Sequence, residues 1–101
     1  MAKTKMPKTI KVAGFTYKIR LVYDLGSTGI GGTINHITST ITLTTHQEGF
    51  ERNKSSLDVL LMHEITHAID FHYLCDALKE DEVKRLAIAL QQVLHDNQLR
   101  F

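Results

Sequence analysis

The chain has 101 residues, 43% of them hydrophobic, and a formal net charge of +1, which is typical of one globular domain. The balance of charges argues against nucleic-acid binding as its main role, and no apolar run approaches the roughly 20 residues that span a bilayer. The single cysteine, Cys75, cannot form an internal disulfide, which favours a reducing cytoplasm. One domain, residues 1–101, is expected, with a flexible start over residues 1–7.

Two strands, residues 8–12 and 15–23, are predicted at the start of the chain. Apolar and polar residues alternate in the second of them, which is the pattern of a half-buried strand. Residues 13–14 fit a two-residue turn between the strands. This turn sets a register in which Val12 lies opposite Phe15.

A glycine-rich connection, residues 24–33, precedes a third predicted strand, residues 34–45. The connection lacks the ending of a P-loop, so no phosphate site is expected there. Threonines fill one face of the third strand, which is unusual for a strand with a core on both sides. We therefore expect Ile37–Thr44 to be an edge strand, whose unpaired N–H and C=O groups are available to another chain.

Two helices are predicted in the second half of the chain. The first is expected to begin at the capping-box sequence of residues 55–58, and the second covers residues 79–97. Three strands followed by two helices predict an α+β fold, with a three-stranded antiparallel sheet.

The strongest chemical signal is an H-E-x-x-H motif, residues 63–67, inside the first predicted helix. His63 and His67 are four residues apart, so they project about 40° apart around the helix axis. Two imidazoles in this arrangement suit Zn²⁺, and Glu64 beside them can act as a general base toward water. The motif therefore predicts a zinc site with one ion per chain.

A catalytic zinc ion usually takes three protein ligands, so a third must come from elsewhere in the chain. The candidates are acidic residues and histidines that follow the motif: Asp70, His72, Asp76, Glu80, Asp81, Glu82 and His95. Glu82 shares the predicted apolar stripe of the second helix and is expected to point into the molecule. Glu80 instead lies beside Lys84, as in an ordinary surface pair. We therefore predict Glu82 as the third ligand.

This assignment makes a demand on the first helix. At 1.5 Å per residue, a helix that continued to Leu78 would carry the chain too far from His67 for Glu82 to return. The first helix is therefore expected to end or bend between about Phe71 and Asp76.

Other polar residues near the motif have several possible roles. Asp70 projects in nearly the same direction as His63, so it could hold a histidine N–H or be solvated. A zinc hydrolase also needs a donor for the developing oxyanion, and His72, Tyr73 and His95 are the candidates. His36 is expected to be solvated at a strand end.

The chain resembles the small gluzincin-type zinc metallopeptidases over residues 57–94. It is most similar to compact phage- and prophage-encoded proteins related to the ImmA/IrrE group. The resemblance is carried by residues 60–70, which read LLMHEITHAID, and by residues 82–87, which read EVKRLA.

The resemblance implies a minimal zincin-like domain, in which His63, His67 and Glu82 bind zinc and Glu64 is the base. It also implies that an edge strand, here Ile37–Thr44, binds an extended peptide substrate. The expected function is thus that of a zinc-dependent peptidase. The alternative is a zinc-binding module that uses the same strand to hold a partner protein, with little or no hydrolysis.

Overall fold

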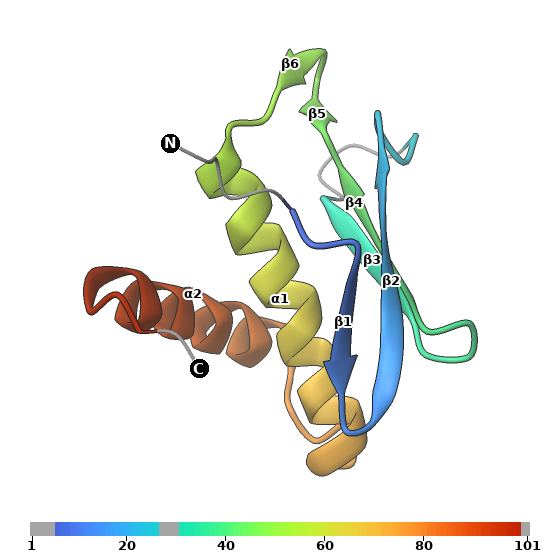
Figure 1. Cartoon of the computed structure of the whole chain (residues 1–101), viewed down its shortest axis with the longest axis vertical. Helices are drawn as coiled ribbons and strands as arrows, with labels where there is room; N and C mark the ends of the chain where they lie inside the picture. The colour runs from blue at the N-terminus through green and yellow to red at the C-terminus, as the bar shows by residue number, and fades with distance from the viewer. Residues whose placement is uncertain (1–5, 27–30, 100–101) are drawn as a thin grey trace.

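A computed structural model of the chain describes residues 6–26 and 31–99. The fold is α+β, with a mixed four-stranded sheet, a short two-stranded ribbon and two helices (Figure 1). The elements in chain order are β1 (Thr9–Val12), β2 (Phe15–Val22), β3 (Gly32–Asn35), β4 (Thr40–Thr44), β5 (His46–Gln47), β6 (Phe50–Glu51), α1 (Lys54–Tyr73) and α2 (Glu80–Asp96).

The first hairpin confirms the predicted register. β1 and β2 pair antiparallel, with Val12 opposite Phe15 and Ile10 opposite Tyr17. The two turn residues adopt positive φ angles, 53° at Ala13 and 83° in the glycine that follows it. Left-handed conformations at both turn positions match the right-handed twist of the paired strands, which is why a two-residue turn closes this hairpin.

The predicted single strand over residues 34–45 is wrong, because the chain folds back on itself within it. β3 and β4 form an antiparallel hairpin in which Ile34 lies opposite Ile41. The Asn35 side chain accepts hydrogen bonds from the backbone N–H groups of Ile37 and Thr38, at 2.9 and 3.1 Å. An asparagine that bonds the backbone two and three residues ahead nucleates a turn, so the strand pattern breaks at this point.

The predicted three-stranded antiparallel sheet is also wrong, because the sheet contains four strands in the order β1-β2-β4-β3 with β2 and β4 parallel. β4 is therefore an inner strand, and Ile37–Thr44 is not an edge. Thr42 and Thr44 are buried because neighbours cover them; the Thr44 hydroxyl, for example, donates to the Gly31 carbonyl at 2.8 Å. The edges of the described sheet are β1 and β3.

Helix α1 contacts β1, β3 and β4, and α2 packs against α1 (Figure 1). Two residues separate β6 from α1, which is capped by Asn53, whose side chain accepts the Ser56 N–H. It ends at Tyr73, inside the window that the predicted ligand geometry required. Neither helix in the described residues is long and apolar enough to cross a membrane.

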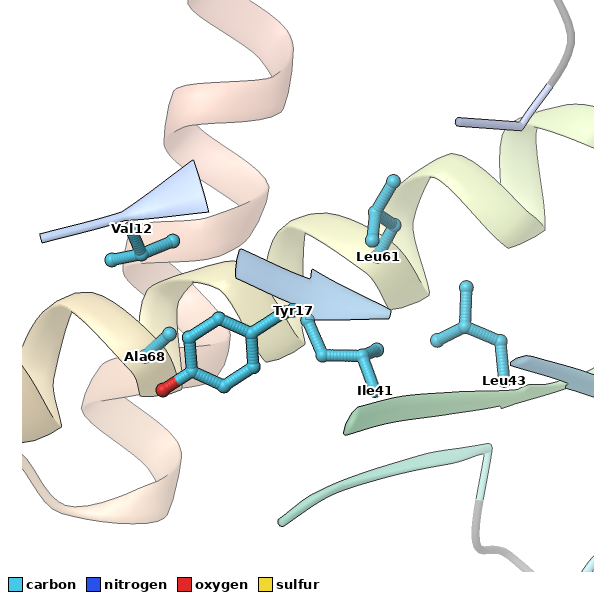
Figure 2. Close-up of a cluster of buried hydrophobic side chains, with 6 residues drawn as sticks. All are labelled: Val12, Tyr17, Ile41, Leu43, Leu61 and Ala68. Carbon is cyan, nitrogen blue, oxygen red and sulfur yellow. The ribbon is translucent and has the colours of Figure 1, made fainter. Parts of the chain in front are cut away.

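The core lies between the sheet and α1. Figure 2 shows side chains from β1, β2, β4 and α1 meeting in one cluster. Its members are Val12, Tyr17, Ile41, Leu43, Leu61 and Ala68. Met6 packs against this cluster, whereas residues 1–5 of the expected flexible start lie outside the described residues. Residues 27–30 of the glycine-rich connection also lie outside them.

The position of β4 inside the sheet can be tested with two isoleucines of the predicted single strand. Ile41 is fully buried, whereas Ile37 is 96% exposed in the β3–β4 turn. We expect Ile41→Ala to lower the free energy of unfolding by roughly 2–5 kcal/mol, because it leaves a cavity in the core. Ile37→Ala should change it by less than about 0.5 kcal/mol. Urea unfolding of both variants measures the difference, and equal losses would contradict the hairpin.

Candidate metal centre

The two motif histidines lie one helical turn apart on α1, and Glu64 directly follows His63. The imidazole rings of His63 and His67 are 4.9 Å apart between centroids, and both side chains are partly buried. Glu64 is 5% exposed and lies on the side of α1 that faces the sheet. The helix therefore presents two imidazole nitrogens toward one point, with a buried carboxylate next to them.

Glu80, the first residue of α2, completes the group. The Nε2 atom of His63 lies 2.6 Å from Glu80 Oε1, and the Nε2 atom of His67 lies 3.0 Å from Glu80 Oε2. Each carboxylate oxygen thus lies close to one imidazole ring. The ligand atoms of the three residues all lie within 4.8 Å of one another.

This set of donors fits a divalent metal ion. Two imidazole nitrogens and one carboxylate oxygen match the donors of catalytic zinc sites, which keep a further position for water or substrate. A hydrogen bond between His63 and Glu80 and the close approach of His67 to the same carboxylate already bring the ligand atoms near enough to share one ion.

The predicted inward orientation of Glu82 is wrong. Glu82 is exposed, and its carboxylate accepts the backbone N–H of Lys79 at 2.8 Å, which caps the start of α2. The buried face of α2 carries Val83 and Ala87, and Glu82 projects about 100° away from Val83 around the helix. Seven residues at about 100° each bring Glu80 within about 20° of Ala87, so Glu80 is the acidic residue on the face toward α1.

Glu64 is the most strongly perturbed ionisable group of the site. Burial raises the pKa of Glu64 to about 7, and the negative charge of Glu80 adds to the rise. Gly32 on β3 makes room for this carboxylate, because a Cβ at that position would lie 3.2 Å from Glu64 Oε2 and 3.0 Å from the Thr42 carbonyl oxygen. The edge strand and the candidate base are therefore in close contact.

A cleft of about 480 Å³ lies beside the group, between β3, α1 and α2. Its polar lining is supplied by His63, Glu64, Glu80 and Lys84. Its apolar lining comes from both helices, namely Val59, Leu60, Ala87 and Ile88, while Gly31 and Gly32 border it on the sheet side. The cleft connects the candidate metal ligands to one end of the edge strand.

The other polar candidates lie outside this group. Asp70 is 1% exposed, and its carboxylate accepts the N–H of Leu78, so neither the solvated nor the histidine-holding role predicted for it is observed. Tyr73 is 64% exposed at the end of α1. The side chain of His95 is 79% exposed near the far end of α2.

His72 belongs to a second cluster, which the sequence analysis missed. The buried Tyr17 hydroxyl lies 2.6 Å from His72 Nε2 and 3.0 Å from His36 Nδ1. Phe15 stacks on His72 and Phe71 stacks on His36. Burial lowers the pKa of His36, and the His72 imidazole lowers it further. His36 is thus not a solvated residue at a strand end. The sequence feature that could have indicated this cluster is Tyr17, because a buried tyrosine hydroxyl needs a hydrogen-bond partner.

No family model, curated protein or solved structure matches this chain. The chemistry of the site must therefore be inferred from its own side chains. Two imidazoles and one carboxylate can hold a metal ion, and a buried carboxylate with a raised pKa lies next to them at the mouth of a cleft.

The raised pKa of Glu64 predicts a pH-dependent stability of the metal-free protein. Between pH 4.5 and about 7 the folded state holds a proton on Glu64 that the unfolded state has lost, so the free energy of unfolding falls as pH rises. Glu64→Gln removes the titrating group, and with it this fall in the free energy of unfolding. We expect the variant to become more stable than the parent over this range, by up to roughly 3 kcal/mol at pH 8.

Urea unfolding in the presence of a chelator, at pH 5 and pH 8, measures this difference. Glu51→Gln, on the exposed strand β6, is the matched control and should show no such trend. A stability difference for Glu64→Gln that is independent of pH would contradict the raised pKa.

The identity of the third ligand is tested by a matched pair of variants. Loss of a residue that hydrogen-bonds a metal ligand typically weakens metal binding by roughly 10- to 100-fold. Glu80→Gln should weaken Zn²⁺ binding by more than this, because it removes a ligand itself. Glu82→Gln should leave the affinity unchanged, because glutamine still accepts the Lys79 N–H. Competition with a chromogenic chelator measures both affinities. The reverse result would restore Glu82 as the ligand.

Proposed function

We propose that this chain is a zinc-dependent peptidase with a zincin-like site. His63, His67 and Glu80 hold the metal ion, and Glu64 is the general base. The observation that carries the proposal is the convergence of both histidine Nε2 atoms on the two oxygens of Glu80, directly beside the buried Glu64. The motif residues and a ligand from a second helix thus meet at one point, as the chemistry requires.

The nature of the ligands supports zinc over other divalent ions. Imidazole is a borderline-soft ligand that suits Zn²⁺, whereas Mg²⁺ and Ca²⁺ prefer sites made mainly of oxygen atoms. When bound, zinc supplies a Lewis acid that polarises the scissile carbonyl group and makes water easier to deprotonate. A structural zinc ion would not need an adjacent base, so the buried Glu64 favours catalysis over a purely structural role.

Glu64 carries the proton transfers in this proposal. Its carboxylate accepts a proton from the attacking water and then donates that proton to the amine of the departing product. A base works best when its pKa is near the operating pH, and burial raises the pKa of Glu64 to about 7. Gly32 keeps backbone, not a side chain, in front of this carboxylate.

The strand that pairs with the substrate is β3, in place of the Ile37–Thr44 segment expected from the sequence. Among the described residues β3 pairs only with β4, so its other side has backbone N–H and C=O groups available to a peptide. An extended peptide that paired there would pass Gly32, the residue in contact with Glu64, and one of its side chains could enter the cleft. Main-chain pairing would supply affinity and the cleft would supply selectivity.

The proposal is tested with Glu64→Gln in the zinc-loaded protein. We expect the variant to keep about one zinc ion per chain while its rate of peptide hydrolysis falls by roughly 10²–10⁴-fold, the usual contribution of a general base. The probes are an unfolded casein and a fluorogenic peptide library. Mass spectrometry of the products and elemental analysis of the protein give the two readouts.

Glu51→Gln is again the control, because it makes the same substitution far from the site. Hydrolysis that persists in Glu64→Gln would overturn the assigned base. A wild-type protein that binds zinc but cleaves none of the probes would favour the alternative, a zinc-binding module that holds a partner protein along β3.

A further inference from the structure

The connection between the two helices contains a sharp reversal of the chain. α1 ends at Tyr73 and α2 begins at Glu80, so only residues 74–79 turn the chain around. Cys75 and Asp76 have φ angles of 56° and 60°, in the left-handed region that non-glycine residues avoid. Two successive residues in this region carry strain, which the surrounding contacts must overcome.

Asp70 supplies several of these contacts. Its backbone carbonyl accepts the N–H groups of Leu74 and Asp76, at 2.9 and 3.0 Å. Its carboxylate is 1% exposed, and Oδ1 accepts the N–H of Leu78 at 3.2 Å. Burying a carboxylate costs desolvation free energy, which an apolar side chain at this position would not. The Asp70 carboxylate therefore contributes a specific hydrogen bond and not simple packing.

The next residue along the chain is fixed in the same way. The N–H of Lys79 is bound by the carboxylate of Glu82, at 2.8 Å. The two backbone N–H groups that immediately precede Glu80 are therefore both held by carboxylates, one from each helix. The starting point of α2, and with it the backbone of Glu80, is determined at this junction.

Asp70 also lies on the same rigid helix as the two histidines, three residues after His67 and seven after His63. The hydrogen bond between Asp70 and Leu78 thus sets the distance between the two histidines and Glu80, which follows Leu78 by two residues. We propose that Asp70 is a positioning residue of the metal site, which sets metal affinity by fixing the backbone that carries Glu80. This inference rests on the metal site of the proposed function.

A double-mutant cycle on Zn²⁺ affinity tests the inference. The four proteins are the wild type, Asp70→Ala, Glu80→Ala and the double variant, each as the full chain, with affinity measured by competition with a chromogenic chelator. We expect Asp70→Ala to weaken binding by roughly 10- to 100-fold. In the Glu80→Ala background the same substitution should cause no further loss, because Asp70 acts through Glu80.

The bound ion provides a second readout that general destabilisation would not change. The visible absorption spectrum of Co²⁺ reports its ligand geometry, so Asp70→Ala should shift the spectrum toward that of Glu80→Ala. Asp70→Asn retains an oxygen acceptor for Leu78 and should restore the wild-type spectrum and affinity. Asp81→Asn removes a carboxylate from the first turn of α2, where it pairs with Arg85, and should leave both unchanged.

Circular dichroism checks that each variant is folded. If Asp70→Ala is unfolded, Asp70→Ser replaces it in the cycle, because a serine hydroxyl is too short to reach Leu78. Equal losses of affinity in both backgrounds, or an unchanged affinity in a folded Asp70 variant, would overturn the positioning role alone. Failure of the wild type to bind Zn²⁺ or Co²⁺ would overturn the metal site of the proposed function, and this inference with it.

Discussion

The site depends on one geometric constraint: a single helix can direct two ligands to a point, but a third must return from another segment. At 1.5 Å per residue, every additional turn of α1 would move the chain away from His63 and His67. The reversal after Tyr73 is therefore the feature that makes a three-ligand group possible. It places two residues in left-handed conformations and buries the Asp70 carboxylate. Both features destabilise the chain locally, and they occur where the fold brings distant residues together.

The sheet contributes to the same site through its edge. The β3–β4 hairpin places β4 inside the sheet and leaves β3 at the edge nearest α1. A side chain at Gly32 would be crowded between the Thr42 carbonyl and the Glu64 carboxylate, at 3.0 and 3.2 Å from its Cβ. The close approach of backbone to Glu64 thus follows from the sheet topology as well as from the helix motif.

Local patterns in the sequence predicted the features that depend on a few neighbouring residues. The α+β class, the first hairpin and the extent of α2 follow from turn residues, caps and periodicity. The end of α1 near Tyr73 was expected for a different reason, because a ligand on the second helix must return to the two histidines. The features that were missed depend on tertiary context. Periodicity ranked Glu82 above Glu80 because it gives an apolar stripe without saying which side of that stripe meets α1. Strand alternation likewise gave no sign of the turn at Asn35, whose side-chain bonds interrupt an otherwise regular pattern.

The electrostatics of the site couple Glu64 to Glu80. Glu64 lies beside Glu80, and both burial and the neighbouring negative charge disfavour its ionised form. At neutral pH the folded protein must either keep a proton on Glu64 or accept two carboxylates close together. A divalent ion on His63, His67 and Glu80 would neutralise the Glu80 charge and favour ionised Glu64. The same change would stabilise the fold and create the base, so that metal binding, stability and proton transfer are linked through one pair of carboxylates.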